Sequence, residues 1–152
     1  AHKLGAFHHL PHGVANALMI EEVLRFNASE APAKMGTFSQ YDHPHTLARY
    51  AEIADHIKLS GSTNAEKTAA LIAFVRELND ALNIPQCIRN YGVDSYFAEQ
   101  GFVPEEVFLE RLPEIAKNAI GDACTGSNPR QPSVEEMEKL LKCCYYDTEV
   151  DF

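Results

Sequence analysis

Residues 10–26 of this chain read LPHGVANALMIEEVLRF. Behind the proline, the stretch is rich in residues with high helix propensity, and its apolar positions leave no clean polar face. A helix that is apolar on most of its sides is a buried one. Pro11 suits the first helical position, where its missing N–H costs nothing. The stretch therefore predicts a buried helix from Val14 to Phe26.

The rest of the sequence also indicates helices. Capping boxes, in which Thr or Ser is followed three residues later by Glu, stand at Thr63 and Ser133. They predict helices that run to about Asn83 and Tyr146. Further helices are expected over residues 45–58, 85–91, 94–100 and 104–120, the last bent at Pro113. Because no alternating run long enough for a strand occurs, we expect an all-α fold, a single domain of about six to eight helices over residues 1–152.

Composition limits the class of protein. A length of 152 residues, with 45% hydrophobic and 23% charged residues, is typical of one globular domain. The net charge of −9, without a Lys/Arg cluster, disfavours nucleic-acid and membrane-surface partners. No bilayer-length apolar run or signal peptide is visible. The four cysteines form no Cys-x-x-Cys pair, which argues against a disulfide framework or a structural zinc site and favours reduced thiols in a cytoplasmic protein.

Four of the seven histidines fall within residues 1–14: His2, His8, His9 and His12. Imidazole is the commonest protein ligand of divalent transition metals. Since a residue before proline avoids helical angles, we expect residues 1–10 to form a loop, with His12 in the first turn of the following helix. No carboxylate lies close by in the sequence to balance a metal at that helix end. Spacing alone leaves a metal site and a ligand-free surface cluster both open.

Two other segments carry polar or aromatic groups. Residues 122–130 hold Asp, Cys, Thr, Asn and Arg around Gly and Pro, and we favour a structured turn in which Asp122 or Asn128 bonds its own backbone. Arg130 is expected to anchor an internal salt bridge. The irregular residues 28–44 are expected to be pinned down or used for contact. His43 and His45 are predicted to be exposed loop histidines.

Several motifs resemble a known family. Residues 1–5, AHKLG, and 11–17, PHGVANA, resemble the signature of the iron-dependent (group III) alcohol dehydrogenases. Residues 38–42, FSQYD, 49–56, RYAEIADH, and 124–130, CTGSNPR, resemble the alcohol dehydrogenase half of the bifunctional aldehyde-alcohol dehydrogenases. The motifs agree in order and cover the chain nearly end to end, so the resemblance is specific.

The resemblance implies which residues act. Members of the family have a dinucleotide-binding domain followed by an all-α domain, and one Asp and three His hold a metal between them. Of these ligands only His12 has a counterpart here, so the resemblance implies that Fe²⁺ (or Zn²⁺, which imidazole also suits) and NAD both need residues upstream of Ala1. His2 matches a catalytic histidine beside the nicotinamide cofactor, where it would relay the hydroxyl proton. His8 and His9 match no ligand position.

The implied function is that of one part of an NAD-dependent, cytoplasmic alcohol dehydrogenase. It would interconvert short-chain aldehydes such as acetaldehyde with alcohols such as ethanol, together with the NAD-binding domain of its parent chain. The isolated chain would be inactive, and the parent would form a homo-oligomer or filament. Two alternatives remain: an all-α assembly or interaction module without its own catalysis, and a histidine-rich metal-binding helical domain.

Overall fold

The expected all-α fold is confirmed. The computed structural model describes residues 1–29, 45–93 and 101–152, and over these ranges it contains helices and turns but no strand. The helix expected over 94–100 lies outside the described residues. The α-helices are α1 (His2–His8), α2 (His12–Ala28), α3 (Thr46–His56), α4 (Asn64–Ala81), α5 (Glu105–Ile120) and α6 (Val134–Tyr146), with short 3₁₀ turns η2 (Ile88–Asn90) and η4 (Thr125–Ser127).

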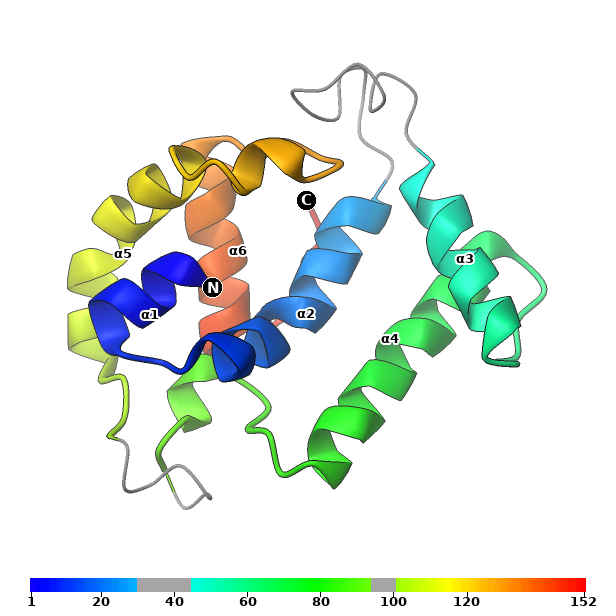
Figure 1. Ribbon diagram of the computed structural model, residues 1–152, viewed down its shortest axis with the longest axis horizontal. Coiled ribbons are helices and arrows are strands. Elements are labelled where there is room, and N and C mark those ends of the chain that lie inside the picture. Colours follow the sequence, from blue (N-terminus) through cyan, green and yellow to red (C-terminus); the bar gives the residue numbers. More distant parts are fainter. Residues whose placement is uncertain (30–44, 94–100) are drawn as a thin grey trace.

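The buried helix predicted from the opening stretch is α2. It packs against α1, α3, α4 and α6, and Figure 1 shows it between the α1, α5 and α6 group and the α3–α4 pair. Most residues of this helix are buried or partly buried, with Ala15, Leu18 and Phe26 among the buried ones, which accounts for its position. The helix begins at His12, two residues before the predicted start, and Pro11 is its N-cap with φ −56°. The central helix therefore presents the His12 end at the surface.

The expected loop over residues 1–10 was wrong, because residues 2–8 form α1. Pro11 restricts only its neighbour Leu10, so the residues further upstream remain free to coil. Leu4, only 1% exposed, fastens the short helix to the core. The helix ends at His9, which adopts the left-handed conformation (φ 59°) and donates its N–H to the Gly5 carbonyl at 3.0 Å.

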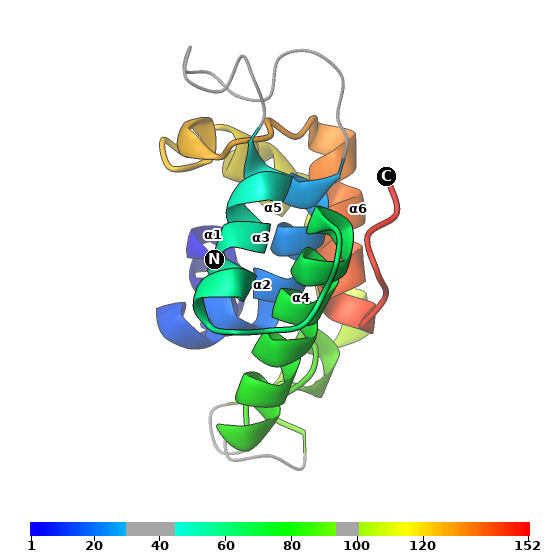
Figure 2. The same cartoon turned by 90° about the vertical axis from the view of Figure 1, so that its right-hand side faces the viewer.

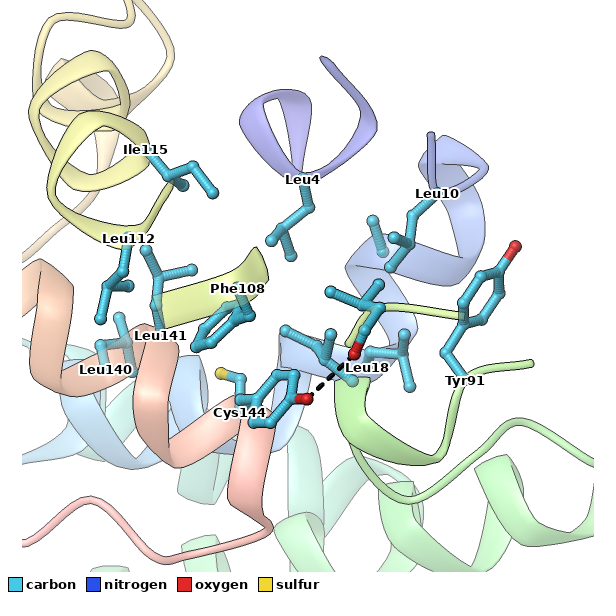
Figure 3. Close-up of a cluster of buried hydrophobic side chains, with 14 of the residues drawn as sticks. Leu4, Leu10, Leu18, Tyr91, Phe108, Leu112, Ile115, Leu140, Leu141 and Cys144 are labelled. Carbon is cyan, nitrogen blue, oxygen red and sulfur yellow. Dashed lines mark hydrogen bonds between the residues drawn. The ribbon is translucent and has the colours of Figure 1, made fainter. Parts of the chain in front are cut away.

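One apolar core joins α1, α5 and α6. Figure 3 shows Leu4, Leu112, Ile115, Leu140 and Leu141 grouped from these three helices. Phe108 of α5 stacks on Tyr145 of α6 with ring centroids 4.2 Å apart, and the buried Tyr145 hydroxyl donates to the Val103 carbonyl at 2.9 Å. The helix α5 continues across Pro113. This core fixes the direction in which α1 presents its first residues.

Both predicted capping boxes are confirmed. Thr63 and Glu66 cap α4, and Ser133 and Glu136 cap α6, each pair with both reciprocal hydrogen bonds. In α4, Leu71 and Ile72 are buried, whereas Leu78 is 46% exposed and Leu82, which follows the helix, is 62% exposed.

The helix expected over residues 85–91 is only the 3₁₀ turn η2. Gly92 follows it at φ 74°, and a Cβ there would meet the Gly101 carbonyl oxygen at 1.7 Å. The close approach of these two backbones ends the turn and excludes any side chain at position 92.

Ion pairs fasten the C-terminal tail to α2 and α4. Arg76 contacts Glu21 at 2.8 Å and Asp147 at 2.5 Å. Glu22, whose pKa is raised by burial, accepts the Val150 N–H at 2.8 Å. Figure 2 shows α3 and α4 lying over α2, and the tail running back beside α6. Among the described residues, none of the helices combines the length and the apolar character needed to cross a membrane.

Candidate active-site cavity

A cavity of about 420 Å³ opens beside α1 and α2. The turn that follows α5 also lines it, and so does α6. Its apolar lining includes Leu4, Met19 and Ile115. Its polar lining consists mainly of His2, Lys3, His12, Asn16, Asp122 and Cys124. The cavity therefore gathers two of the histidines singled out in the sequence with a carboxylate and a thiol from a distant segment.

His12 is the first residue of α2 and is exposed at the cavity. The Asn16 side-chain amide, one turn further along the helix, donates to the His12 Nε2 at 3.1 Å and to the His12 carbonyl at 3.0 Å. Because an amide nitrogen only donates, Nε2 acts as the acceptor, so this nitrogen carries no proton and its lone pair takes the Asn16 hydrogen bond. This is the state in which an imidazole binds a metal ion.

His2 is stacked on His12. The ring centroids are 5.1 Å apart and the planes differ by 22°. The His2 Nδ1 faces the Asp122 carboxylate, at 3.2 Å from Oδ2, and since a carboxylate only accepts, Nδ1 is the donor. This bond leaves Nε2 of His2 as the nitrogen available to another group. The two rings that the resemblance assigned to metal and cofactor chemistry are thus brought together.

Asp122 is held by three donors. The Cys124 backbone N–H donates to Oδ1 at 3.0 Å, and the Lys3 ammonium lies 3.1 Å from Oδ2, beside the His2 imidazole. The Cys124 N–H first, and then Lys3 and His2, hold the pKa of the Asp122 carboxyl well below its usual range. The expected turn in which Asp122 bonds its own backbone is confirmed. Asp122 also brings a carboxylate to His2 from a distant part of the sequence, whereas the sequence around His2 contains none.

The rest of that segment is structural. Asn128 and Asn27 form a reciprocal amide pair, with hydrogen bonds of 2.7 and 3.1 Å. Arg130 is the predicted internal anchor: its guanidinium contacts Glu136 at 3.0 Å and lies over the Phe26 ring at 3.8 Å. These contacts tie the end of α2 to the start of α6 and so brace one side of the cavity.

The other histidines among the described residues do not line the cavity. His8 packs near Phe108, and burial lowers its pKa. His9 caps α1, and His45 is exposed at the start of α3, as predicted. His43 lies outside the described residues. All four cysteines are free thiols.

Sequence reasoning missed Lys3 and Asn16 as partners of the two histidines. Asn16 could have been found, because it lies one helical turn beyond His12 on the same face. Lys3 is paired with a carboxylate more than a hundred positions away, and no local signal reveals that pairing.

An all-helical domain that presents stacked imidazoles and a carboxylate at an open cavity has the groups of the metal- and proton-handling part of an enzyme. The sequence model of the "Fe-containing alcohol dehydrogenase family, C-terminal" matches residues 1–145, and the chain belongs to this family.

Individual relatives agree. The chain is 44% identical over 148 residues to the bifunctional aldehyde-alcohol dehydrogenase AdhE of Escherichia coli (strain K12), covering 96% of this chain and 16% of that protein. It is 42% identical over 152 residues to the NADPH-dependent butanol dehydrogenase of Clostridium saccharobutylicum, covering 100% of this chain and 33% of that protein.

A solved structure is similar as well. The iron-containing alcohol dehydrogenase from Thermococcus thioreducens superposes with a TM-score of 0.67 at 28% identity, covering 95% of this chain and 30% of that one. The chain therefore spans a third or less of the length of these relatives.

Proposed function

We propose that this chain is the C-terminal helical part of an NAD-dependent alcohol dehydrogenase that interconverts short-chain aldehydes, such as acetaldehyde, with their alcohols. The observation that carries the proposal is the stacked His2–His12 pair at an open cavity, in a chain that belongs to the Fe-containing alcohol dehydrogenase family. The family name supports Fe²⁺ as the metal, and imidazole suits Zn²⁺ equally.

His12 is proposed as a metal ligand. Its position at the cavity and the unprotonated Nε2 both fit that role, and the binding of a metal would replace the Asn16 hydrogen bond. When bound, the divalent ion supplies a Lewis acid for the alcohol or aldehyde oxygen, and the nicotinamide cofactor carries the hydride. Catalytic metal sites use about three protein ligands, so His12 needs partners from elsewhere in the parent protein.

His2 is proposed as the catalytic residue that holds the cofactor and moves the hydroxyl proton. Asp122 fixes the orientation of the ring through Nδ1, which leaves Nε2 as the nitrogen that exchanges a proton. A fixed ring reaches a reacting hydroxyl without first losing rotational freedom.

The isolated chain is proposed to be inactive. It offers one of the four ligands that the resemblance implies, and it spans 16% and 33% of two dehydrogenase relatives. The proposed partner is an NAD-binding domain of the same polypeptide, in a cytoplasmic homo-oligomer or filament without nucleic-acid or membrane partners. The 28–44 stretch, expected to be an assembly contact, lies mostly outside the described residues.

An activity assay tests the proposal. Purified chain should give no NADH-dependent reduction of acetaldehyde, whereas the full-length parent should reduce it. Because one relative is named an NADPH-dependent butanol dehydrogenase, NADPH and butyraldehyde form the comparison arm. Turnover by the isolated chain at ordinary dehydrogenase rates would refute the proposal that the chain is only an inactive part of the enzyme. A parent that reduces no aldehyde with either cofactor would refute the assigned reaction.

A further inference from the structure

Three different metal-ligating side chains converge at the cavity. His2 comes from the first turn of α1, whereas Asp122 and Cys124 come from the turn after α5. Their ligand atoms, a ring nitrogen, a carboxylate oxygen and the thiol sulfur, all lie within 4.8 Å of one another. We propose that His2, Asp122 and Cys124 form a three-ligand binding site for Zn²⁺ or a similarly soft divalent ion. The site makes no use of His12.

The distances suit such an ion. Zn²⁺ binds nitrogen and oxygen at about 2.0–2.2 Å and sulfur at about 2.3 Å, which sets tetrahedral ligand atoms roughly 3.3–3.8 Å apart. Nδ1 of His2 and Oδ2 of Asp122 are already 3.2 Å apart. The Cys124 sulfur needs only a small side-chain movement to complete the set, and it is exposed and free to make it.

Two of the three ligands are held in place beforehand. The Cys124 N–H binds Oδ1 of Asp122, so the carboxylate and the cysteine are fixed within one turn. The Thr125 hydroxyl donates to the Ala119 carbonyl at 2.6 Å and secures that turn on the end of α5. An ion therefore meets a carboxylate held by this turn and a His2 ring held by that carboxylate, and it orders mainly the Cys124 thiol.

The charges also favour a divalent transition ion. A thiolate, a carboxylate and a neutral imidazole together balance a charge of +2. Thiolate selects soft or borderline ions such as Zn²⁺ over Mg²⁺ or Ca²⁺. Because all three side chains line the cavity, a fourth position remains open to water, as in zinc sites with three protein ligands.

Lys3 already pairs with one of the proposed ligand atoms. Its ammonium lies 3.1 Å from Oδ2 of Asp122, on a side chain that is 30% exposed. A bound ion would take the place of the ammonium and of the proton on His2 Nδ1, and Lys3 would swing towards solvent. Lys3 thus competes with the ion, so a Lys3→Met variant should bind the ion more tightly. If the Lys3–Asp122 pair served only the structure, Lys3→Met would not be expected to increase the affinity for the ion.

Cobalt titration of the purified chain tests the site directly. Co²⁺ takes zinc positions, and its thiolate bond gives a charge-transfer absorption in the near ultraviolet. The chain should show this band, and Zn²⁺ should displace it. Cys124→Ser should abolish the band. Asp122→Asn, which keeps the turn, and His2→Gln should each weaken Co²⁺ binding by more than about tenfold, since loss of a group that merely supports a ligand costs about 10–100-fold.

Two matched variants serve as controls. Cys143→Ser removes another thiol that is not fully buried, and His12→Gln removes the stacked histidine; both should keep the band. Circular dichroism checks that every variant is folded. The proposal is overturned if the folded chain shows no thiolate band, if Cys124→Ser keeps it, or if His12→Gln removes it. Unchanged Co²⁺ affinity in Asp122→Asn and His2→Gln would show that Cys124 alone binds the ion, and it would also overturn the three-ligand proposal.

This test is independent of the proposed dehydrogenase function, because its readout is metal binding by the chain itself. If the dehydrogenase role of His2 is also correct, Zn²⁺ at this site inhibits the parent by occupying His2, and Cys124→Ser relieves the inhibition.

Discussion

Replacing Arg130 by Ala should destabilise the chain strongly, because one guanidinium joins three segments. The side chain is only 11% exposed. It donates to the Phe26 carbonyl at the end of α2 at 2.9 Å and to the Phe152 carbonyl in the tail at 3.0 Å. It also pairs with Glu136 of α6 at 3.0 Å and covers the Phe26 ring at 3.8 Å.

The size of the loss in the free energy of unfolding depends on which partners of Arg130 stay buried after the guanidinium is removed. A hydrogen bond to a charged group contributes about 1.5–3 kcal/mol, and a cation–π contact about 0.5–2 kcal/mol. Glu136 is partly exposed, so water takes over much of its interaction, whereas the buried Phe26 carbonyl loses its charged donor and keeps the Ser29 hydroxyl at 2.8 Å. We therefore expect a loss of about 3–5 kcal/mol in the free energy of unfolding. For a chain of this size that loss lowers Tm by roughly 6–20 °C.

Urea unfolding followed by far-UV circular dichroism measures the effect. The matched control is Arg111→Ala, because Arg111 is 50% exposed and its nearest acid, Glu114, lies 3.7 Å away on the same helix. That exposed pair should contribute less than about 0.5 kcal/mol. If Arg130→Ala stayed within about 1 kcal/mol of the original chain, or equalled the control, the anchoring role of Arg130 would be refuted.

Three further changes test other parts of the structure. Leu4→Ala should lower the free energy of unfolding by about 2–5 kcal/mol, because Leu4 fastens α1 to the core; urea unfolding with a loss below about 1 kcal/mol would mean that α1 is not docked. Thr63→Ala should cost about 0.5–2 kcal/mol through the lost capping box, and an unchanged Tm would contradict this. Glu22→Gln should stabilise the chain at neutral pH. Burial raises the folded-state pKa of Glu22, so the ionised group opposes folding above that pKa, and the opposition fades as pH falls to the unfolded value of about 4.3. If the extra stability of the Glu22→Gln variant over the original chain did not shrink below about pH 5, the raised pKa of Glu22 would be contradicted.

Local rules predicted the parts of this fold that local contacts determine. The buried α2 and the two capping boxes depend on residues a few positions apart, so propensity and spacing were sufficient. The helix α1 is too short for those rules, since seven residues are marginal as a helix without tertiary support, and its support comes from the burial of Leu4 in the core.

The site was predictable in part. His2 and His12 were found through the family motifs, and the structure brings them into ring contact. Their neighbourhood could not be derived, because the Asp122 carboxylate reaches His2 from 120 positions away. The polar composition of residues 122–130 was the available signal. It was assigned to turn formation, and the structure shows that the same Asp122 serves both the turn and the histidine.

The metal content of the full-length parent, measured with single substitutions at the two stacked histidines, tests the central claim most directly. His12→Ala should strip the catalytic metal and abolish turnover, because it removes a ligand. His2→Ala should keep this catalytic metal and impair kcat, because His2 is proposed to move the proton and not to bind that metal. Full occupancy of the catalytic metal in the His12 variant would contradict the account, and loss of that same metal in the His2 variant would show that the two roles are reversed.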